Sequence, residues 1–455
     1  MKTVAVIGGG ISGLSAAEAI GRIAQSRGVE LRAVVLEAGA RAGGKIGTRH
    51  HDGFSIETGP HGFLDKEPLL TQLIERLGLT GRVLRADEAA ARRYIVQRGS
   101  LCELPMSPPK FLLSRVLPLF AKLRLMLEPL IARRPADAAE ESVWSFAARR
   151  MGREAADVLI DAMVSGVFGG DPRRLSIASA FPAVVALERA HGSLIRGQIA
   201  QRRMSAGPRG VLNSFDQGLA VLIDALAARL EVKTSAAVER IERTGSRWRL
   251  ALATGEAIEA DVVVATAPAD ATARLIAPLD DDASRALDAI PYAPIAVVVQ
   301  AFEACDLPRA LDGFGFLAPD RERRKLLGSI FASTVFRGHA PDGTVMLRSM
   351  LGGARHPENA EGDDATLLAR ARGEIEALLG LAPGARPKLE EVLRWPRAIP
   401  QYELGHAERV RRVDHAEKRL PGLLFGGNAL RGVAVVQCVA DAERLGARAL
   451  DLVTS

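Results

Sequence analysis

The residues with the clearest chemical pattern are three glycines near the start of the chain, Gly8, Gly10 and Gly13. They follow a short β-branched run, residues 3–7, and precede residues 14–24, which are predicted to form a helix. In this pattern the first glycine permits a tight turn, and the second lets the backbone approach a pyrophosphate. The third lets the helix pack on the strand, so that the positive end of the helix faces the phosphates.

An acidic residue follows at the position that this pattern requires. A second predicted strand, residues 31–36, ends at Glu37, where a carboxylate can accept hydrogen bonds from a pair of ribose hydroxyls. Strand, glycines, helix, strand and acid in this order predict a dinucleotide-binding unit. A glycine-rich turn in an ordinary α/β domain is the alternative.

A second glycine motif lies just beyond the ribose acid. It reads Arg41-Ala42-Gly43-Gly44-Lys45, and Gly59-Pro60 comes later in the chain. An acid followed by Arg-x-Gly-Gly resembles the second fingerprint of the flavin amine-oxidase superfamily. There, backbone amides and an arginine meet the pyrophosphate, and the Gly-Pro lies beside the isoalloxazine. The resemblance implies FAD as the cofactor, since NAD-binding domains have no counterpart.

Length and composition limit the elements that could position these residues. A chain of 455 residues is expected to form two or three domains. Three distant cysteines suggest a reducing compartment and predict neither disulfides nor a metal site. We expect no signal peptide and, because no uncharged apolar run reaches about 18 residues, no transmembrane helix. The net charge of +6 fits an anionic membrane, an anionic substrate or RNA equally well.

Two adjacent arginines stand at the start of a predicted hairpin. Residues 92–96 read as a strand, residues 98–100 as a turn and residues 101–104 as the returning strand. Neighbouring side chains of a strand point to opposite faces. One of Arg92 and Arg93 is therefore expected in solvent, while the other could enter a cavity and hold a carboxylate through its planar fork.

Residues 105–134 differ in composition from their surroundings. Leucine, valine, isoleucine and phenylalanine are interleaved with six lysines and arginines, whereas Glu128 is the single acid. Basic, leucine-rich amphipathic segments lie in the interface of anionic membranes. The segment predicts a peripheral membrane contact. A helix pair packed on a neighbouring domain, with its cations in water, is the alternative.

Several motifs outside the nucleotide fingerprints resemble one family of this superfamily, the FAD-dependent protoporphyrinogen oxidases. They are SGVFGGD at residues 165–171, NSFDQGL at 213–219, GFGFLAP at 313–319, MLGG at 350–353 and IPQY at 399–402. The likeness is collinear over essentially the whole chain. It implies an α/β (α+β) fold, in which a Rossmann-like FAD-binding domain carries an inserted helical membrane-contacting domain and an antiparallel-sheet substrate domain. The predicted divisions are 1–90, 206–272 and 420–455 for the FAD domain, 105–187 for the helical domain, and 91–104, 188–205 and 273–419 for the substrate domain.

The resemblance also assigns roles to residues of this chain. It places Arg93 on a substrate propionate, with Arg92 as the solvated neighbour. It implies that Phe314, Leu317, Met350 and Leu351 sandwich a tetrapyrrole beside Gly166, whereas ordinary sheet core is the alternative for any one of them. The implied FAD-binding residues, with Trp395 near the isoalloxazine and Val238 at the adenine, are Gly8, Gly9, Gly10, Ile11, Ser12, Gly13, Glu37, Ala38, Arg41, Gly43, Gly44, Lys45, Gly59, Pro60, His61, Gly62, Val238, Ala267, Trp395, Gly427, Asn428, Val433, Ala434 and Val435.

One departure from the family's pattern lies in the last segment. The family runs G-[VI]-[AG]-[VL]-N-D-C, whereas this chain has Val436-Gln437 before Cys438. Backbone contacts from residues 433–435 to the flavin's pyrimidine side survive this change. Any side-chain bond that the Asn-Asp pair makes does not, so flavin geometry or redox tuning is expected to differ.

The implied activity is the oxygen-dependent oxidation of protoporphyrinogen IX to protoporphyrin IX in heme biosynthesis, a six-electron oxidation in three flavin cycles that releases hydrogen peroxide. The expected partners are the porphyrinogen, dioxygen, a membrane surface and the next heme-pathway enzyme in a hand-off, with no nucleic acid and a homodimer left open. The expected location is the cytoplasm, with peripheral membrane association. No metal ligand set and no general base are assigned.

The alternatives differ in substrate or in class. Coproporphyrinogen III, with four carboxylates, suits the same fold, and a more basic cavity rim would favour it. A carotenoid desaturase or a monoamine oxidase is a more distant alternative. Monoamine oxidation would need an aromatic cage, and the chain has only three tyrosines and three tryptophans. A weakly catalytic flavoprotein that carries porphyrin(ogen) is the third alternative, motivated by Val436-Gln437.

Overall fold

The computed structural model describes residues 1–65, 67–105, 107–135, 138–204 and 210–454. The chain forms two compact units, each assembled from separate stretches of sequence. Unit 1 comprises Met1–Arg85, Gly210–Pro291 and Ala407–Ser455, and unit 2 comprises Ala86–Arg209 and Tyr292–His406.

Unit 1 is built on a parallel five-stranded sheet in the order β10-β2-β1-β14-β20. The two central strands are almost wholly apolar and buried, as expected for a parallel sheet covered on both faces. The strands are β1 (Lys2–Ile7), β2 (Leu31–Leu36), β10 (Glu231–Lys233), β14 (Val262–Ala265) and β20 (Leu423–Phe425).

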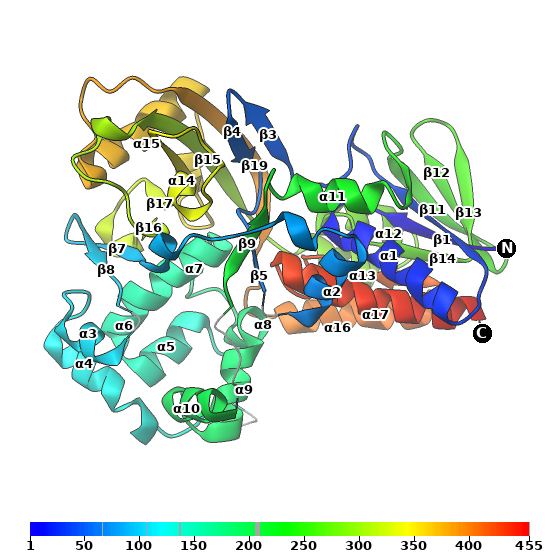
Figure 1. Cartoon of the computed structure of the whole chain (residues 1–455). Helices are drawn as coiled ribbons and strands as arrows, with labels where there is room; N and C mark the ends of the chain where they lie inside the picture. The colour runs from blue at the N-terminus through cyan, green and yellow to red at the C-terminus, as the bar shows by residue number, and fades with distance from the viewer. Residues whose placement is uncertain (66, 106, 136–137, 205–209, 455) are drawn as a thin grey trace. The chain divides into compact units, whose positions relative to one another are not determined.

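Two long helices of unit 1 pack side by side, α1 (Ile11–Ser26) and α17 (Val435–Thr454) (Figure 1). They meet closely because Gly446 has no side chain: a methyl group there would lie 2.9 Å from Ala19 Cβ. The remaining elements of unit 1 are β3 (Thr48–His51), β4 (Phe54–Glu57), β5 (Phe63–Leu64), α2 (Pro68–Arg76), η1 (Thr80–Arg82), β6 (Val83–Arg85), β9 (Leu212–Phe215), α11 (Ala220–Ala227), β11 (Val238–Thr244), β12 (Arg247–Leu252), β13 (Ala257–Ala260), α12 (Ala269–Ile276), α13 (Asp281–Asp288) and α16 (His406–Arg419).

Unit 2 contains a seven-stranded sheet in the order β19-β15-β18-β17-β16-β7-β8. All its neighbours are antiparallel except β16 and β7, which are parallel. The strands are β7 (Tyr94–Gln97), β8 (Ser100–Glu103), β15 (Tyr292–Glu303), β16 (Gly315–Leu317), β17 (Leu326–Phe331), β18 (Thr344–Gly352) and β19 (Leu389–Pro400).

Helices cover both faces of this sheet. Side chains of α15 (Asp364–Leu379) pack on the face that carries Phe316 and Leu351. The opposite face packs against the helical region between β8 and β15 through Ile95, Leu317, Val158 and Ala162. The remaining elements of unit 2 are η2 (Glu88–Ala91), α3 (Pro108–Leu113), α4 (Leu119–Met126), η3 (Glu128–Leu130), α5 (Val143–Met151), α6 (Arg153–Ala155), the π-helix η4 (Ala156–Ile160), α7 (Asp161–Phe168), α8 (Ile177–Ala180), α9 (Pro182–His191), α10 (Leu194–Met204), η5 (Ala304–Asp306), η6 (Asp320–Glu322), α14 (Ala332–Val335) and η7 (Pro357–Ala360).

The predicted fold class, a Rossmann-like parallel sheet with a second, mainly antiparallel sheet, is confirmed. The predicted strand at residues 92–96 begins two residues later, so Arg92 and Arg93 precede β7. The helical region and the substrate sheet belong to one compact unit, and their separation into two domains stays a prediction. The predicted boundary at residues 205 and 206 lies outside the described residues. Within the described chain, no helix is long and apolar enough to cross a bilayer.

Candidate active site

The first glycine turn has the geometry that a pyrophosphate requires. Gly8 has φ = +102°, and a methyl group at Gly13 would lie 1.9 Å from the Gly8 carbonyl oxygen, so the helix can approach the strand only with glycine there. Gly10 precedes the first turn of α1 with no side-chain cap, and no atom lies within 4 Å of a methyl group built on it. Open space therefore borders Gly10 at the positive end of this helix.

Glu37 is held in place by the same turn. Its two carboxylate oxygens accept hydrogen bonds of 2.7 Å from the Gly9 and Gly39 amides. A carboxylate offers about four acceptor positions, so this leaves lone pairs for ribose hydroxyls. Ala38 lies between Glu37 and Gly39 in the same loop.

The second glycine motif packs directly on the first. The Gly43 amide donates to the Gly9 carbonyl at 2.7 Å, and a methyl group on Gly44 would lie 3.3 Å from Gly10 Cα. Gly43 and Gly44 have φ values of +117° and +57°, which only glycine adopts easily. The Arg41 guanidinium donates to the Ile46 carbonyl at 3.2 Å, so a cation is fixed beside this double turn.

The start of α17 reaches the same place. Burial raises the pKa of the Cys438 thiol to about 11, although a hydrogen bond with Ser12 and the charge of Lys45 act against the rise. These contacts join the first turns of α1 and α17 to the second glycine motif. The thiol is neutral at physiological pH and is a packing group.

Gln437, which departs from the family's Asn-Asp pattern, caps the N-terminus of α17. Its side-chain oxygen accepts a 3.1 Å hydrogen bond from the Ala434 amide, three residues earlier. This is the second half of a capping box, in which a glutamine at the third helical position bonds back to the N-cap amide. The Ala434 amide, predicted as a flavin contact, is therefore engaged, while those of Val433, Val435 and Val436 have no partner among the described residues.

The remaining residues predicted to bind the cofactor in unit 1 lie in tight backbone contacts. A methyl group on Gly59 would lie 2.0 Å from the Lys45 carbonyl oxygen, and one on Gly62 would lie 2.7 Å from the Asn213 carbonyl oxygen. Pro60 and His61 stand between these glycines, and the His61 side chain is buried. The Ala267 amide lies 3.0 Å from a methyl built on Gly8, and Gly427, which precedes Asn428, has φ = +97°. Val238 opens β11 at a β-bulge, half-buried.

These residues fit FAD. Two stacked glycine turns, the uncapped N-terminus of α1, the partly capped N-terminus of α17, an anchored carboxylate and an arginine provide donors for phosphates and acceptors for a ribose. Gly10 and Gly44 keep the backbone free of side chains where a pyrophosphate must approach. The structure thus brings together the predicted residues of 8–13, 37–45 and 433–435 in one unit.

The predicted substrate residues divide between the two faces of the unit 2 sheet. Residues paired across neighbouring strands share a face, and the register aligns Val297, Met350, Gly328, Leu317 and Ile95 in one row. We call this side of the sheet the apolar face. Leu317 and Met350 are half-buried on it. Trp395 lies on the same side, because it pairs with Ile295, two residues from Val297.

Leu351 points the other way. Successive residues of a strand alternate between faces, so Met350 and Leu351 cannot line one cavity. Leu351 is fully buried in the core cluster with Phe316 and Leu367. Gly166 meets the apolar face directly, since a methyl group on it would lie 2.9 Å from Leu317 Cδ2.

The two arginines at the hairpin differ in their partners. Arg92 forms an ion pair with Asp312, which also accepts a 2.8 Å hydrogen bond from the Tyr94 hydroxyl. Burial raises the pKa of Asp312, but the Tyr94 hydroxyl and the Arg92 charge outweigh it, and the pKa lies below its ordinary value. Arg93 is exposed, has no anionic partner among the described residues, and places its guanidinium carbon 5.9 Å from the centre of the Phe314 ring.

The helical region carries eight exposed large apolar side chains within residues 112–130, on α3, α4 and η3 and at the junction of α4 and η3. We call this group the apolar ledge; its members are Leu112, Leu113, Leu119, Phe120, Leu123, Met126, Leu127 and Leu130. Elsewhere in the described chain, exposed large apolar residues stand singly, at Met1, Leu64, Val167, Ile199 and Leu404. Contiguous exposed apolar surface marks an interaction site.

Some charged side chains of this region are buried, and others are exposed to solvent. Lys122 is buried and donates to backbone carbonyls of Leu112 and Ser114, whereas Lys110, Arg115 and Arg133 are exposed without ion-pair partners in the described ranges. Glu128, the one acid, is buried against Arg150, which is itself fully buried.

The surroundings of Glu128 keep it ionised. Burial raises its pKa, but hydrogen bonds from the Ser193 hydroxyl and from the Leu194 and Ile195 amides, with the Arg150 charge, outweigh this effect. Its pKa therefore lies below the ordinary value. From the sequence, Glu128 was identified only as the single acid of a basic segment, and nothing in the sequence indicated that Arg150 would be its buried partner.

Comparisons with known proteins agree with this architecture. The family model for flavin-containing amine oxidoreductases matches residues 11–449. The chain is 32% identical over 478 residues to the chloroplastic protoporphyrinogen oxidase of Oryza sativa subsp. japonica, covering 99% of this chain and 88% of that one. It is 27% identical to the coproporphyrinogen III oxidase of Bacillus subtilis (strain 168), covering 96% of both.

A solved structure gives the same result at the level of the fold. A crystal structure from Exiguobacterium sp. 255-15, assigned as a protoporphyrinogen oxidase, superposes with a TM-score of 0.83 at 26% identity and covers 99% of both chains. A full-length family match, full-length relatives above 30% identity and a cradle that fits the cofactor agree. The chain belongs to the flavin-containing amine oxidoreductase family, in its protoporphyrinogen oxidase group, and is an FAD-dependent oxidase.

Proposed function

We propose that this oxidase converts protoporphyrinogen IX to protoporphyrin IX, with dioxygen as the terminal acceptor. The observation that carries the proposal is Arg93: an exposed guanidinium without an anionic partner stands beside Phe314, close to the predicted substrate residues. A flexible apolar macrocycle with two propionates needs an apolar surface and a cation at its edge. The full-length relatives named protoporphyrinogen oxidase support this assignment.

The residues of this chain would act mainly by binding and orientation. Leu317 and Met350 would offer apolar contact from one side of the sheet, and Gly166, which lacks a side chain, lets α7 pack directly on Leu317. Arg93 would hold a propionate by a charge-assisted hydrogen bond. FAD held by the glycine turns of unit 1 would supply the redox chemistry: in each of three cycles the porphyrinogen would lose a hydride to the flavin and a proton from a pyrrole nitrogen, and dioxygen would be reduced to hydrogen peroxide. We assign no general base.

Two predicted residues are treated differently in this proposal. Leu351 belongs to the core on the opposite side of the sheet, so we retain it as a packing residue only. Trp395 lies on the apolar side of β19 in unit 2, and its place near the isoalloxazine stays a prediction.

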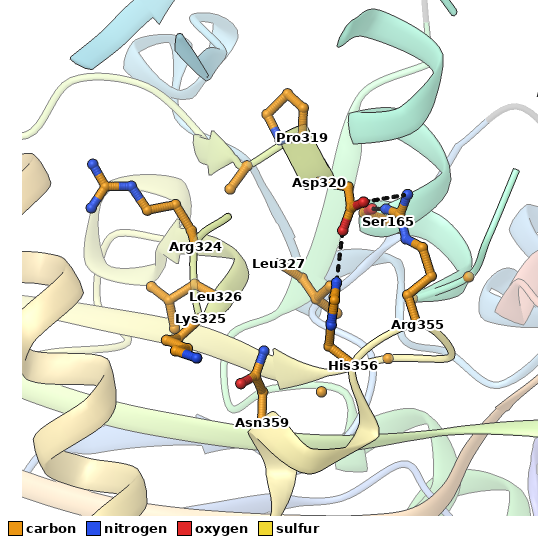
Figure 2. A pocket seen from close by; sticks show the side chains of 15 residues that line it. Ser165, Pro319, Asp320, Arg324, Lys325, Leu326, Leu327, Arg355, His356 and Asn359 are labelled. Carbon is orange, nitrogen blue, oxygen red and sulfur yellow. Dashed lines mark hydrogen bonds and ion pairs between the residues drawn. The ribbon is translucent and has the colours of Figure 1, made fainter. Parts of the chain in front are cut away.

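Coproporphyrinogen III is the second candidate substrate. Full-length relatives from Bacillus subtilis and from Propionibacterium freudenreichii bear the name coproporphyrinogen III oxidase. A substrate with four carboxylates requires more cations than Arg93 alone; Lys325, an exposed cation that lines the cavity of Figure 2, is one candidate in unit 2. Aerobic turnover of both porphyrinogens by the holoenzyme, followed by porphyrin fluorescence and peroxide, tests the assignment. A preference for the first substrate with about three peroxides per porphyrin supports it. A preference for the second changes the substrate, and turnover of neither favours the carrier alternative.

We also propose that the apolar ledge docks on an anionic membrane. Its eight exposed apolar side chains lie close together in the sequence, and exposed cations flank them at Lys110, Arg115 and Arg133. The single acid of the segment, Glu128, is buried and paired, so no exposed carboxylate within the described part of the segment opposes anionic lipid. Amphipathic helices of this composition bind in the plane of the interface. A hand-off to the next heme-pathway enzyme and a cytoplasmic, peripheral location remain parts of the same proposal.

A further inference from the structure

A clamp of charged side chains holds the first turns of α7 in unit 2. The Arg355 guanidinium bonds to both carboxylate oxygens of Asp161, one of them at 3.1 Å, and to the Ser165 hydroxyl at 3.0 Å. The Asp161 carboxylate also accepts the Asp320 amide at 2.8 Å. Figure 2 shows Arg355 and His356 converging on Asp320, at the edge of a cavity.

The segment that carries Arg355 also forms a hydrogen bond at the C-terminal end of α7. The Ala354 amide donates to the carbonyl of Gly169, the left-handed residue that ends the helix, at 2.7 Å. The neighbouring Gly353 amide donates to the Pro294 carbonyl of β15 at 2.8 Å. The loop after β18 therefore ties α7 at both ends to the sheet.

Helix α7 packs on the apolar face of the sheet, which carries Leu317 and Met350, the residues proposed to contact the substrate. Gly166 lies midway between Asp161 and the C-cap and rests on Leu317. Arg355 has only 19% and Asp161 only 7% of its side chain exposed. Burial lowers the pKa of Arg355, but the hydrogen bonds and charge of Asp161 outweigh it and raise that pKa above its ordinary value, so the guanidinium stays charged.

We propose that Arg355 is a positioning residue for the substrate: through Asp161 and Ser165 it sets the distance between α7 and the apolar face. This inference rests on the proposed function. A bidentate arginine fixes both position and orientation of a carboxylate, which a lysine cannot do. Loss of the fork would let α7 shift on the sheet while the FAD cradle, built from unit 1, keeps its residues.

The test compares three holoenzyme variants, Arg355→Met, Arg355→Lys and Arg324→Met. Arg324 lines the same cavity and is ion-paired with Glu374, so it is the matched control. Protoporphyrin IX is the probe, with binding followed by fluorescence, and FAD absorbance checks that each variant is folded and loaded. Arg355→Met should raise the porphyrin Kd and the KM about tenfold with kcat within about threefold, Arg355→Lys should lie between, and Arg324→Met should match the parent.

Each outcome decides the inference. If kcat falls while Kd and KM are unchanged, or if Arg324→Met has the same effect as Arg355→Met, the positioning role is overturned. If Arg355→Met does not fold, Ser165→Ala removes one bond of the clamp, and an unchanged Kd in that variant overturns the inference. A parent enzyme that binds no porphyrin refutes the proposed function itself, and the positioning role with it.

Discussion

Two of the most exposed members of the apolar ledge allow the membrane proposal to be tested quantitatively. Leu113 and Phe120 expose 88% and 65% of their surface, together about one and a half fully exposed side chains. Burying a large apolar side chain contributes about 1.5–3 kcal/mol, so inserting both into a bilayer contributes about 2.3–4.6 kcal/mol. Since about 1.4 kcal/mol changes an equilibrium tenfold, the variant Leu113→Ser/Phe120→Ser should bind vesicles about 40- to 2,000-fold more weakly.

The assay is co-sedimentation with vesicles of phosphatidylcholine containing phosphatidylglycerol. Both substituted residues are exposed, so the melting temperature should stay close to that of the parent. Leu404→Ser is the matched control, because Leu404 is an exposed leucine, 41% accessible, outside the ledge. Binding of the double variant within twofold of the parent would refute the reasoning. So would equal binding of the parent to vesicles without the anionic lipid, since Lys110, Arg115 and Arg133 should each add about 1 kcal/mol near an anionic surface.

Three further predictions concern the site and its support. Arg93→Ala should raise KM about 10- to 100-fold with kcat little changed, because a hydrogen bond to a charged group contributes about 1.5–3 kcal/mol. Arg92→Ala is the control. Equal effects of the two substitutions in steady-state kinetics would contradict a specific role of Arg93. Gln437→Leu should weaken FAD binding about 2- to 30-fold in a flavin-release titration, because a lost N-cap bond costs about 0.5–2 kcal/mol, and an unchanged Kd would show that the cap does not support the flavin. Arg150→Met should lower the free energy of unfolding by about 3–5 kcal/mol in denaturant titrations, since it strands the buried Glu128 charge. In the parent, the Glu128 contribution is present above the ordinary glutamate pKa and is lost as the pH falls through the lowered pKa of the folded state, and Glu128→Gln should remove this pH dependence.

Much of the fold was predictable because local chemistry determines it. The first strand, the glycine turn, α1 and β2 follow from glycine positions and β-branched runs, and β2 was predicted with the bounds that the structure has. Gly13 and Gly43 stand where no other residue fits. A Cβ atom would lie 1.9 Å from a carbonyl oxygen at position 13 and 2.6 Å from one at position 43. Such constraints are visible in one sequence.

What the sequence did not reveal depends on contacts between distant segments. Met350 and Leu351 are adjacent, and only the register of β18 shows that they face opposite sides. The clamp between Asp161 and Arg355 joins residues 194 positions apart. From the sequence, Val436-Gln437 was expected to lose the side-chain bonds of the family's Asn-Asp pair. In the structure the Gln437 side chain accepts a hydrogen bond from the Ala434 amide. The spacing of three residues between these two positions is the one signal that could have indicated it.

The central claim is that FAD bound in this chain takes electrons from protoporphyrinogen IX. The most direct measurement is an anaerobic titration of the holoenzyme with the porphyrinogen, followed by flavin absorbance and porphyrin fluorescence. A six-electron oxidation in two-electron cycles predicts that each porphyrin formed bleaches about three flavins, and that air restores the yellow band. A flavin band that stays unbleached while porphyrinogen is bound would contradict the account and identify a porphyrinogen-carrying flavoprotein.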